Sequence, residues 1–400
     1  MKSIGFLSGK IKQKQEDFIV TEKVNLKINP KDQDPYYVYK LTKKEWNTHD
    51  ILIKIAKHNN IRFQEIAFGG RKDRYGITTQ YITTKKKLLL PNSYKDKVQL
   101  EYLGTSKEPM ESKKIIENEF IITVRDIRKT DIPKILENVD EIKQFGFINY
   151  YDSQRFSTFD VTYGIPLFYL IEENYSNFLK YYLSHSIPKE SSEAKDRKYS
   201  FLTNWMNWKY CLRISKTQIE KRIFQYLSKN KNIKNILNYI PSQELKFMFS
   251  IFQSYVWNLS VVEYLKQKTN LFYFKTRIGN LGFTKQYKEK DLLFFPLIYK
   301  DTYKIPEYSS YMVAVSAKIF EMYLHSKYDE SRFNKFLNLR IKNQTFAYKF
   351  RNLQVFPKNF QILEIKEDDN NKNKMLLRLK FSLESGCYGT MLIKRLLARI

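Results

Sequence analysis

One short segment, residues 67–80, combines residue types that an enzyme could use. Asp73 has Lys72 and two arginines as near neighbours, and Gly69 and Gly70 precede it. Adjacent cations favour the ionised form of a carboxylate, and glycines let a substrate approach the backbone closely. An ionised Asp could act as a nucleophile or stabilise a developing positive charge. A plain surface turn with Asp73 in a salt bridge is the alternative interpretation.

Several other catalytic patterns are absent from the sequence. It contains no GxxxxGK[ST], no GxGxxG, no HExxH and no CxxC, which disfavours the common nucleotide, dinucleotide and zinc enzymes. The four histidines, at positions 49, 58, 185 and 325, do not have the spacing of a metal site. A zinc deaminase would also need cysteine pairs and an H-x-E element. We therefore expect no metal and no cofactor.

The charge of the chain points to a polyanionic partner. There are 70 Lys and Arg against 42 Asp and Glu, a formal charge of +28, and aromatic residues make up 16% of the chain. Tyr and Phe beside Lys can stack on unpaired nucleotides and neutralise their phosphates. Nucleic acid is thus the expected partner. A merely basic surface is the alternative, because most of the cations are lysines spread along the chain.

The two cysteines and the hydropathy of the chain bear on its compartment. Cys211 and Cys387 are too few for a disulfide framework and fit a reducing compartment. No uninterrupted apolar stretch approaches the ~20 residues of a membrane helix. We expect a cytoplasmic protein with no membrane contact, and nothing in the sequence calls for a dimer, so we expect a monomer.

The elements around Asp73 must form a scaffold that positions it. Alternating residues predict strands within 17–41 and 99–125 and on both sides of the glycine pair, and apolar spacing predicts helices from Asn47 or Thr48 and over 132–145. Residues 165–265 are mostly helical in pattern, 374–383 form a strand, and 388–398 a short basic helix. Residues 364–374 predict a solvated hairpin loop. The fold class is α+β, with a mixed, mainly antiparallel sheet.

The change of pattern after Phe156 predicts two domains. Residues 1–157 together with 345–400 form the first, and residues 158–344 form an inserted helix-rich domain.

Six segments form an ordered pattern along the chain. They are Glu16-Asp17-Phe18-Ile19-Val20-x-Glu22, Trp46-Asn47-Thr48, Gly70-x-Lys72-Asp73 with Thr78 and Gln80, Asn118-x-Phe120 followed by Asn149-Tyr150-Tyr151-x-x-Gln154-Arg155-Phe156, Phe249-Ser250 through Asn258, and Leu379 to Thr390. In this order they resemble the TruD family of transfer-RNA pseudouridine synthases. Any one of them is weak, but the shared order is strong. They cover residues 12–157 and 374–400 well and the middle of the chain poorly.

The sequence departs from the family pattern at five positions. Tyr151 and Tyr388 stand where the family usually has Phe, Asp152 and Ser157 where it has Gly, and Gly69 where Ala is common. Tyrosine keeps the flat stacking face of phenylalanine and adds a hydroxyl.

The resemblance implies a role for particular residues. Asp73 would be the nucleophile, and Lys12, six residues before Phe18, the cation that pairs with it. The pocket for the uridine would be lined by aromatic rings and one amide, and for each ring ordinary core packing is the alternative. These lining residues are Phe18, Asn149, Tyr151 and Tyr388; Gly70, Lys72, Gln80 and Arg155 would support the motif or contact RNA.

The implied activity is conversion of a uridine in transfer RNA to pseudouridine, at position thirteen of the D arm, after the base leaves its stack. Other structured RNA is a further candidate substrate. A non-catalytic RNA-binding or RNA-chaperone protein on the same fold is the alternative from another class. A metal-dependent nuclease is a third, but no cluster of carboxylates surrounds Asp73.

Overall fold

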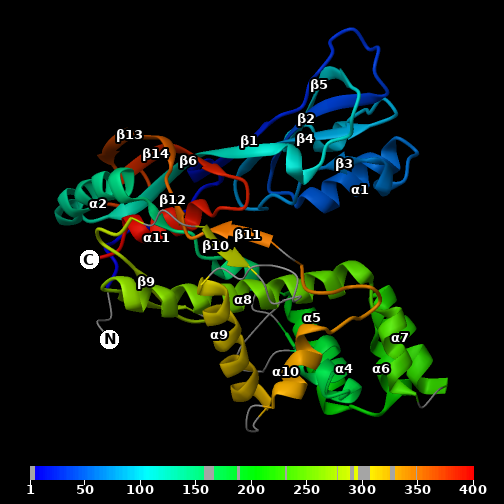
Figure 1. The fold of residues 1–400 in the computed structure, drawn as a ribbon. Helices are drawn as coiled ribbons and strands as arrows, with labels where there is room; N and C mark the ends of the chain where they lie inside the picture. Colours follow the sequence, from blue (N-terminus) through cyan, green and yellow to red (C-terminus); the bar gives the residue numbers. More distant parts are fainter. Residues whose placement is uncertain are drawn as a thin grey trace. The chain divides into compact units, whose positions relative to one another are not determined.

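The computed structural model describes residues 5–156, 166–186, 190–229, 232–276, 278–288, 292–295, 307–324, 329–347 and 349–400 (Figure 1). The chain forms two compact units. The sheet unit comprises Ile4–Asn149 and Gln354–Ile400, and the helical unit has Tyr150–Leu353 as its main part. The sequence analysis placed the junctions at 157/158 and 344/345, whereas the units meet at 149/150 and 353/354. Ser157 and His325 lie outside the described residues.

Eight strands of the sheet unit form one sheet: β1 (Phe18–Val24), β2 (Tyr36–Lys44), β3 (Ala67–Phe68), β4 (Ile77–Thr84), β5 (Val98–Ser106), β6 (Ile115–Ile127), β13 (Lys358–Glu367) and β14 (Met375–Glu384). Their order is β13-β14-β6-β1-β4-β2-β5, and β3 pairs with β4. The β1–β4 pair is parallel and the other neighbours are antiparallel. This confirms the α+β class with a mixed, mainly antiparallel sheet.

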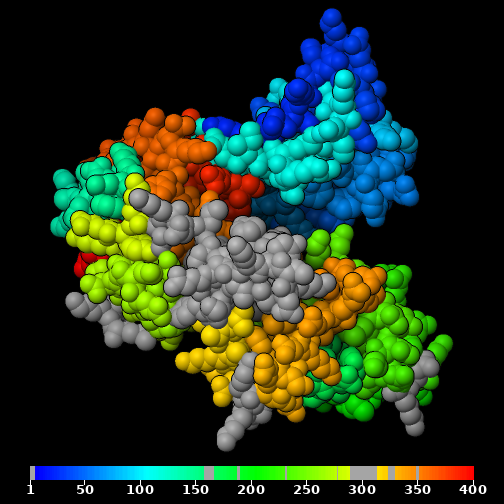
Figure 2. Space-filling model, viewed as in Figure 1, coloured from blue at the N-terminus to red at the C-terminus, as the bar shows by residue number. Residues whose placement is uncertain are grey.

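Three helices belong to the sheet unit: α1 (Thr48–His58), α2 (Ile132–Phe145) and α11 (Gly389–Leu396). The apolar face of α1 packs in one core cluster with inward-facing residues of β2 and β4, among them Leu41 and Ile82. The Asn138 side chain on α2 donates to the carbonyl oxygens of Leu396 and Ala398, at 2.7 and 2.9 Å. Segments far apart in the sequence, coloured teal and red in Figure 2, therefore share this unit.

A short two-stranded ladder marks the place where the chain leaves the sheet unit and returns. It pairs β7 (Phe147–Ile148) with β12 (Gln354–Val355) in antiparallel register.

The helical unit is built around its longest helix, α8 (Ser242–Lys268) (Figure 1). Rings from α8, such as Phe249 and Phe252, pack with Phe168 and Phe336 in the core. Among the described residues, no helix is long and apolar enough to cross a membrane. The other elements are α3 (Pro166–Ile171), α4 (Tyr175–Ser184), α5 (Ser192–Thr203), α6 (Trp208–Ile214), α7 (Gln218–Lys229), α9 (Glu307–Leu324), α10 (Glu330–Leu337), β8 (Phe272–Thr276), β9 (Gly279–Phe283), β10 (Leu292–Phe295) and β11 (Lys349–Asn352).

The β13–β14 loop differs from the solvated hairpin that the sequence predicted. The Asp368 side chain is fully buried, and its carboxylate accepts a hydrogen bond from Arg125 on β6, at 2.8 Å. Arg125 also binds Asp17, at 2.7 Å, and Asp369. An acidic loop is usually solvated, but here a buried guanidinium from a distant strand compensates the carboxylates.

Candidate active site

The loop between β3 and β4 carries Asp73, and a glycine fixes its C-terminal end. Gly76 has a φ of +130°, and a Cβ atom there would lie 2.3 Å from the carbonyl oxygen of Phe18. No other residue type fits without a backbone shift. The Gly76 N–H also donates to Oε1 of Gln15, at 2.7 Å. At Gly70, by contrast, a Cβ atom would meet nothing within 4 Å, which leaves the backbone there open to a substrate.

The structure brings Lys12 and Asp73 together. Nζ of Lys12 lies 2.8 Å from Oδ2 of Asp73, and the side chains are 20% and 36% exposed. The same ammonium lies 4.0 Å from the centre of the Phe18 ring. Lys12 has a φ of +62°, an unfavourable conformation for a lysine, which persists only where the surrounding structure holds it.

Hydrogen bonds on both sides hold the turn that carries Lys12. Before it, the backbones of Lys10 and Arg125 exchange two hydrogen bonds of 2.7 and 2.8 Å. After it, the Asp17 carboxylate accepts from Arg125 and from the backbone N–H of Lys14, both at 2.7 Å. The Asn371 side chain in the β13–β14 loop donates to Oε1 of Gln13, at 2.8 Å. The network that fixes the position of Lys12 thus includes residues near both ends of the chain.

The cations next to Asp73 in the sequence are not its partners in the structure. Nζ of Lys72 lies 3.0 Å from Glu22, whose side chain is fully buried, and 2.5 Å from Oδ1 of Asn118. Nε of Arg74 donates to the carbonyl oxygen of Glu45, at 3.2 Å. Lys72 therefore braces the loop against β1 and β6, and the cation beside the Asp73 carboxylate is Lys12.

Gln80 takes part in a chain of hydrogen bonds under the glycine pair. The backbone N–H of Lys72 donates to the Thr48 hydroxyl, at 3.0 Å, and that hydroxyl donates to Oε1 of Gln80, at 2.8 Å. Nε2 of Gln80 then donates to the carbonyl oxygen of Gly70, at 3.3 Å. Since Thr48 and Gln80 are buried, this chain ties the loop to the start of α1.

Lys43 is a functional residue that the sequence analysis missed. Its side chain is buried, and Nζ donates to the carbonyl oxygens of Trp46, at 2.7 Å, and Asp73, at 2.8 Å. It therefore holds the backbone of the residue that carries the carboxylate. The signal was present in β2, where Lys43 continues the inward-facing positions of Tyr39 and Leu41.

Lys43 gives the protein a measurable pH dependence of stability. Burial lowers the pKa of Lys43 from its ordinary value of 10.5 to about 8, although the Asp73 carboxylate acts in the opposite direction. Between these two values the unfolded chain keeps a proton that the folded chain has lost, so folding becomes more favourable as the pH rises. Urea unfolding from pH 7.5 to 10.5 measures this effect in the wild type and in Lys43→Met. Over this range the free energy of unfolding of the wild type should rise relative to that of the variant by on the order of 3 kcal/mol. A difference independent of pH would contradict the lowered pKa.

Phe18 lies beneath the Lys12–Asp73 pair and is 3% exposed. Its ring contacts Phe120 edge to face, with centroids 6.2 Å apart, and Phe120 stacks on Phe381 at 5.3 Å. The ring therefore packs in the core and also contacts the Lys12 ammonium.

Asn149 and Tyr388 belong to the same unit as Asp73. Asn149 is 2% exposed, immediately after β7, and Tyr388 is half-buried at the N-cap of α11.

Tyr151 and Arg155 belong to the helical unit. The Asn258 side chain pairs with both the N–H and the carbonyl of Tyr151, each at 2.9 Å. The centroid of the Tyr151 ring lies 3.9 Å from the Arg351 guanidinium and 5.8 Å from the Arg155 guanidinium.

Comparisons with known proteins identify the family of the chain. Residues 2–290 match the family model described as tRNA pseudouridine synthase D (TruD). The chain is 34% identical to tRNA pseudouridine synthase D of Leptospira interrogans serovar copenhageni, over 99% of this chain and 97% of that protein. It is 33% identical to the probable tRNA pseudouridine synthase D 2 of Methanocaldococcus jannaschii, over 96% and 91%.

A solved structure has the same fold. The crystal structure of a putative tRNA pseudouridine synthase D from Methanosarcina mazei aligns with a TM-score of 0.66 at 20% identity, covering 99% of this chain and 95% of that one. The family model and the relatives define the class of the protein as an RNA-modifying isomerase. The chain belongs to the TruD family of tRNA pseudouridine synthases.

Proposed function

We propose that this enzyme converts the uridine at position thirteen of transfer RNA, in the D arm, to pseudouridine, with Asp73 as the catalytic carboxylate and without a cofactor. The observation that carries the proposal is the 2.8 Å ion pair between Lys12 and Asp73 on a loop fixed from several sides. The Lys12 ammonium holds the carboxylate in one orientation.

The geometry of the ion pair leaves one carboxylate oxygen for the substrate. Lys12 binds Oδ2, whereas Oδ1 has no hydrogen bond or ion pair among the described residues, and the Asp73 side chain is 36% exposed. Oδ1 is therefore the atom that we assign to the reaction.

The reaction breaks the N1–C1′ bond, turns the uracil and joins C1′ to C5. The C5 hydrogen leaves as a proton and N1 takes one up, so the product is an isomer of the substrate. An ionised Asp73 serves two routes, attack on C1′ or removal of a ribose proton to give a glycal. In either route the uridine must first leave its stack. Phe18 and Tyr388 form flat walls that receive the base, and Asn149 of the same unit reads its edge. Tyr151 belongs to the helical unit, and its stacking role stays a prediction from the family resemblance.

The two domains divide the work. The sheet unit carries the chemistry, and the helical unit, which contains the predicted insertion at residues 158–344, binds RNA. Gly70, Lys72 and Gln80 support the catalytic loop, which is where their contacts lie, and Arg155 contacts RNA.

Transfer-RNA transcripts labelled with tritium at uridine C5 test the activity and the position. Release is expected from a transcript with uridine at position thirteen and not from a matched transcript with cytidine there. Equal release from both would place the reaction at another uridine. Binding without release from any cellular transfer RNA would favour the RNA chaperone, and magnesium-dependent strand scission the nuclease.

A further inference from the structure

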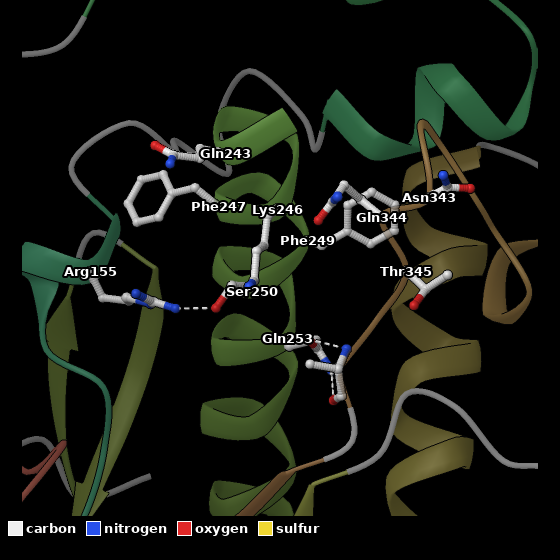
Figure 3. Close-up of a pocket in the computed structure, with 11 residues that line it drawn as sticks. Arg155, Gln243, Lys246, Phe247, Phe249, Ser250, Gln253, Asn343, Gln344 and Thr345 are labelled. Carbon is white, nitrogen blue, oxygen red and sulfur yellow. Dashed lines mark hydrogen bonds between the residues drawn. The ribbon is translucent and has the colours of Figure 1, made fainter. Parts of the chain in front are cut away.

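The helical unit contains a cavity of about 500 Å³ beside α8 (Figure 3). Arg155 lies on one side of it and the turn at 343–345 on the other, as Figure 3 shows. Two of the lining residues, Arg155 and Lys246, are cations and none is acidic. This volume lies within the range of sites that hold small molecules, about 300–1,000 Å³, and the charge selects an anion.

The Arg155 guanidinium is held in place without a counter-ion. Nε donates to the Ser254 hydroxyl, at 3.2 Å, and one terminal nitrogen donates to the Ser250 hydroxyl. Within the described part of the chain, no carboxylate lies within ion-pair distance of Arg155. A guanidinium has five N–H donors, so donors remain for a ligand. A half-buried cation of this kind is well suited to a phosphate group.

An aromatic ring lies next to this cation. Phe247 on α8 is 40% exposed, and the Arg155 guanidinium lies 5.4 Å from its ring centroid. Burial of a large apolar side chain is favourable, but part of this ring stays in contact with solvent. A nucleobase that stacks on Phe247 would supply that burial beside the guanidinium.

The opposite wall of the cavity is rigid and polar. The Gln253 side chain on α8 donates to the carbonyl oxygen of Ala347, at 2.7 Å, and accepts from its N–H, at 3.1 Å. Phe249 and Phe346 pack with ring centroids 4.8 Å apart. These contacts fix the segment that carries Asn343 and Gln344, two of the residues that line the cavity. Amides that offer both donors and acceptors can read the edge of a base.

We infer that this cavity holds one unstacked nucleotide of the RNA substrate, separate from the uridine that is modified. Arg155 and Lys246 bind its phosphate, Phe247 stacks on its base, and the amides of Asn343 and Gln344 contact the base edge. The inference rests on the proposed function, since it takes RNA as the substrate. The helical unit would then have a specific nucleotide-binding site in addition to its positive charge.

The test measures the affinity of the full-length protein for a transfer-RNA transcript from 50 to 300 mM salt. The variants are Lys246→Gln and Phe247→Ala, and the control is Lys268→Gln. Lys246 and Lys268 are both exposed on α8, about 33 Å apart along the helix axis. Lys246→Gln should weaken binding and reduce the slope of log K against log salt by about 0.7–0.9, the loss of one phosphate contact. Phe247→Ala should weaken binding roughly 5- to 100-fold with the slope unchanged. Lys268→Gln should leave the slope as in the wild type.

Wild-type affinity and slope in both Lys246→Gln and Phe247→Ala would overturn the inference, as would equal slope changes in Lys246→Gln and Lys268→Gln. Thermal unfolding checks that each variant is folded, which the exposure of both side chains leads us to expect. Tritium release by the wild-type preparation separates the two proposals. If the wild type releases tritium but the variants bind RNA as the wild type does, only the inference about the cavity is refuted. If the wild type releases no tritium from any transfer RNA, the proposed function is refuted.

Discussion

We expect Asp73→Asn to release tritium from uridine C5 at least about 10⁴-fold more slowly than the wild type, the scale seen when a nucleophile is removed. Asparagine has nearly the same shape but no negative charge, so it can neither attack C1′ nor remove a ribose proton. The loop should stay in place, because its contacts to Lys43, Thr48 and Gln80 do not involve the Asp73 carboxylate. Affinity for transfer RNA should therefore remain near that of the wild type.

Asp96→Asn is the matched control for this experiment. Asp96 is exposed in the same unit and lies outside the loop that carries Asp73, and its replacement removes the same charge. It should release tritium at the wild-type rate. A wild-type rate in Asp73→Asn would show that another group performs the reaction.

The second large effect is expected on stability. Arg125→Met should lower the free energy of unfolding by about 3–5 kcal/mol, the usual result of removing one partner from a buried ion pair. The carboxylates of Asp17 and Asp368 are 1% and 0% exposed, and the variant leaves both without their guanidinium. Urea unfolding at pH 7 measures the change.

A surface arginine and a double variant make this result specific. Arg62→Met removes an 83% exposed guanidinium from its pair with Glu65, and its effect should stay within about 0.5 kcal/mol. Adding Asp368→Asn to Arg125→Met removes one of the uncompensated charges and should restore part of the lost stability. If Arg125→Met and Arg62→Met were equally stable, the buried network would contribute nothing.

Local patterns were sufficient to predict much of the scaffold. The 3.6-residue spacing of Ile51, Leu52 and Ile55 predicted α1, and the spacing over 132–145 predicted α2 with the bounds that the structure gives. Such patterns depend only on neighbours along the chain. The pairing of Lys12 with Asp73 was a different kind of prediction, since it came from the family resemblance and not from spacing.

Contacts between distant strands could not be predicted from local patterns. Asp368 was assigned to a solvated loop because its sequence neighbours are polar, while Arg125, its partner, lies on β6. The cations next to Asp73 in the sequence were interpreted as its partners. Lys72 instead pairs with Glu22 on β1, a contact between residues far apart in the sequence. The burial of Lys43 could have been predicted only by extending the alternation of inward-facing residues to the last residues of β2.

The division of the sheet unit across the helical unit sets an order of events during synthesis. When the ribosome has made the chain up to residue 353, β6 still lacks its neighbour β14, and Asn371 has not yet been joined to the chain that holds Gln13. Domains generally fold as they emerge, but the turn that presents Lys12 must wait for almost the whole polypeptide. A nascent or prematurely terminated chain that ends before β14 and Asn371 therefore lacks contacts that position Lys12 beside Asp73.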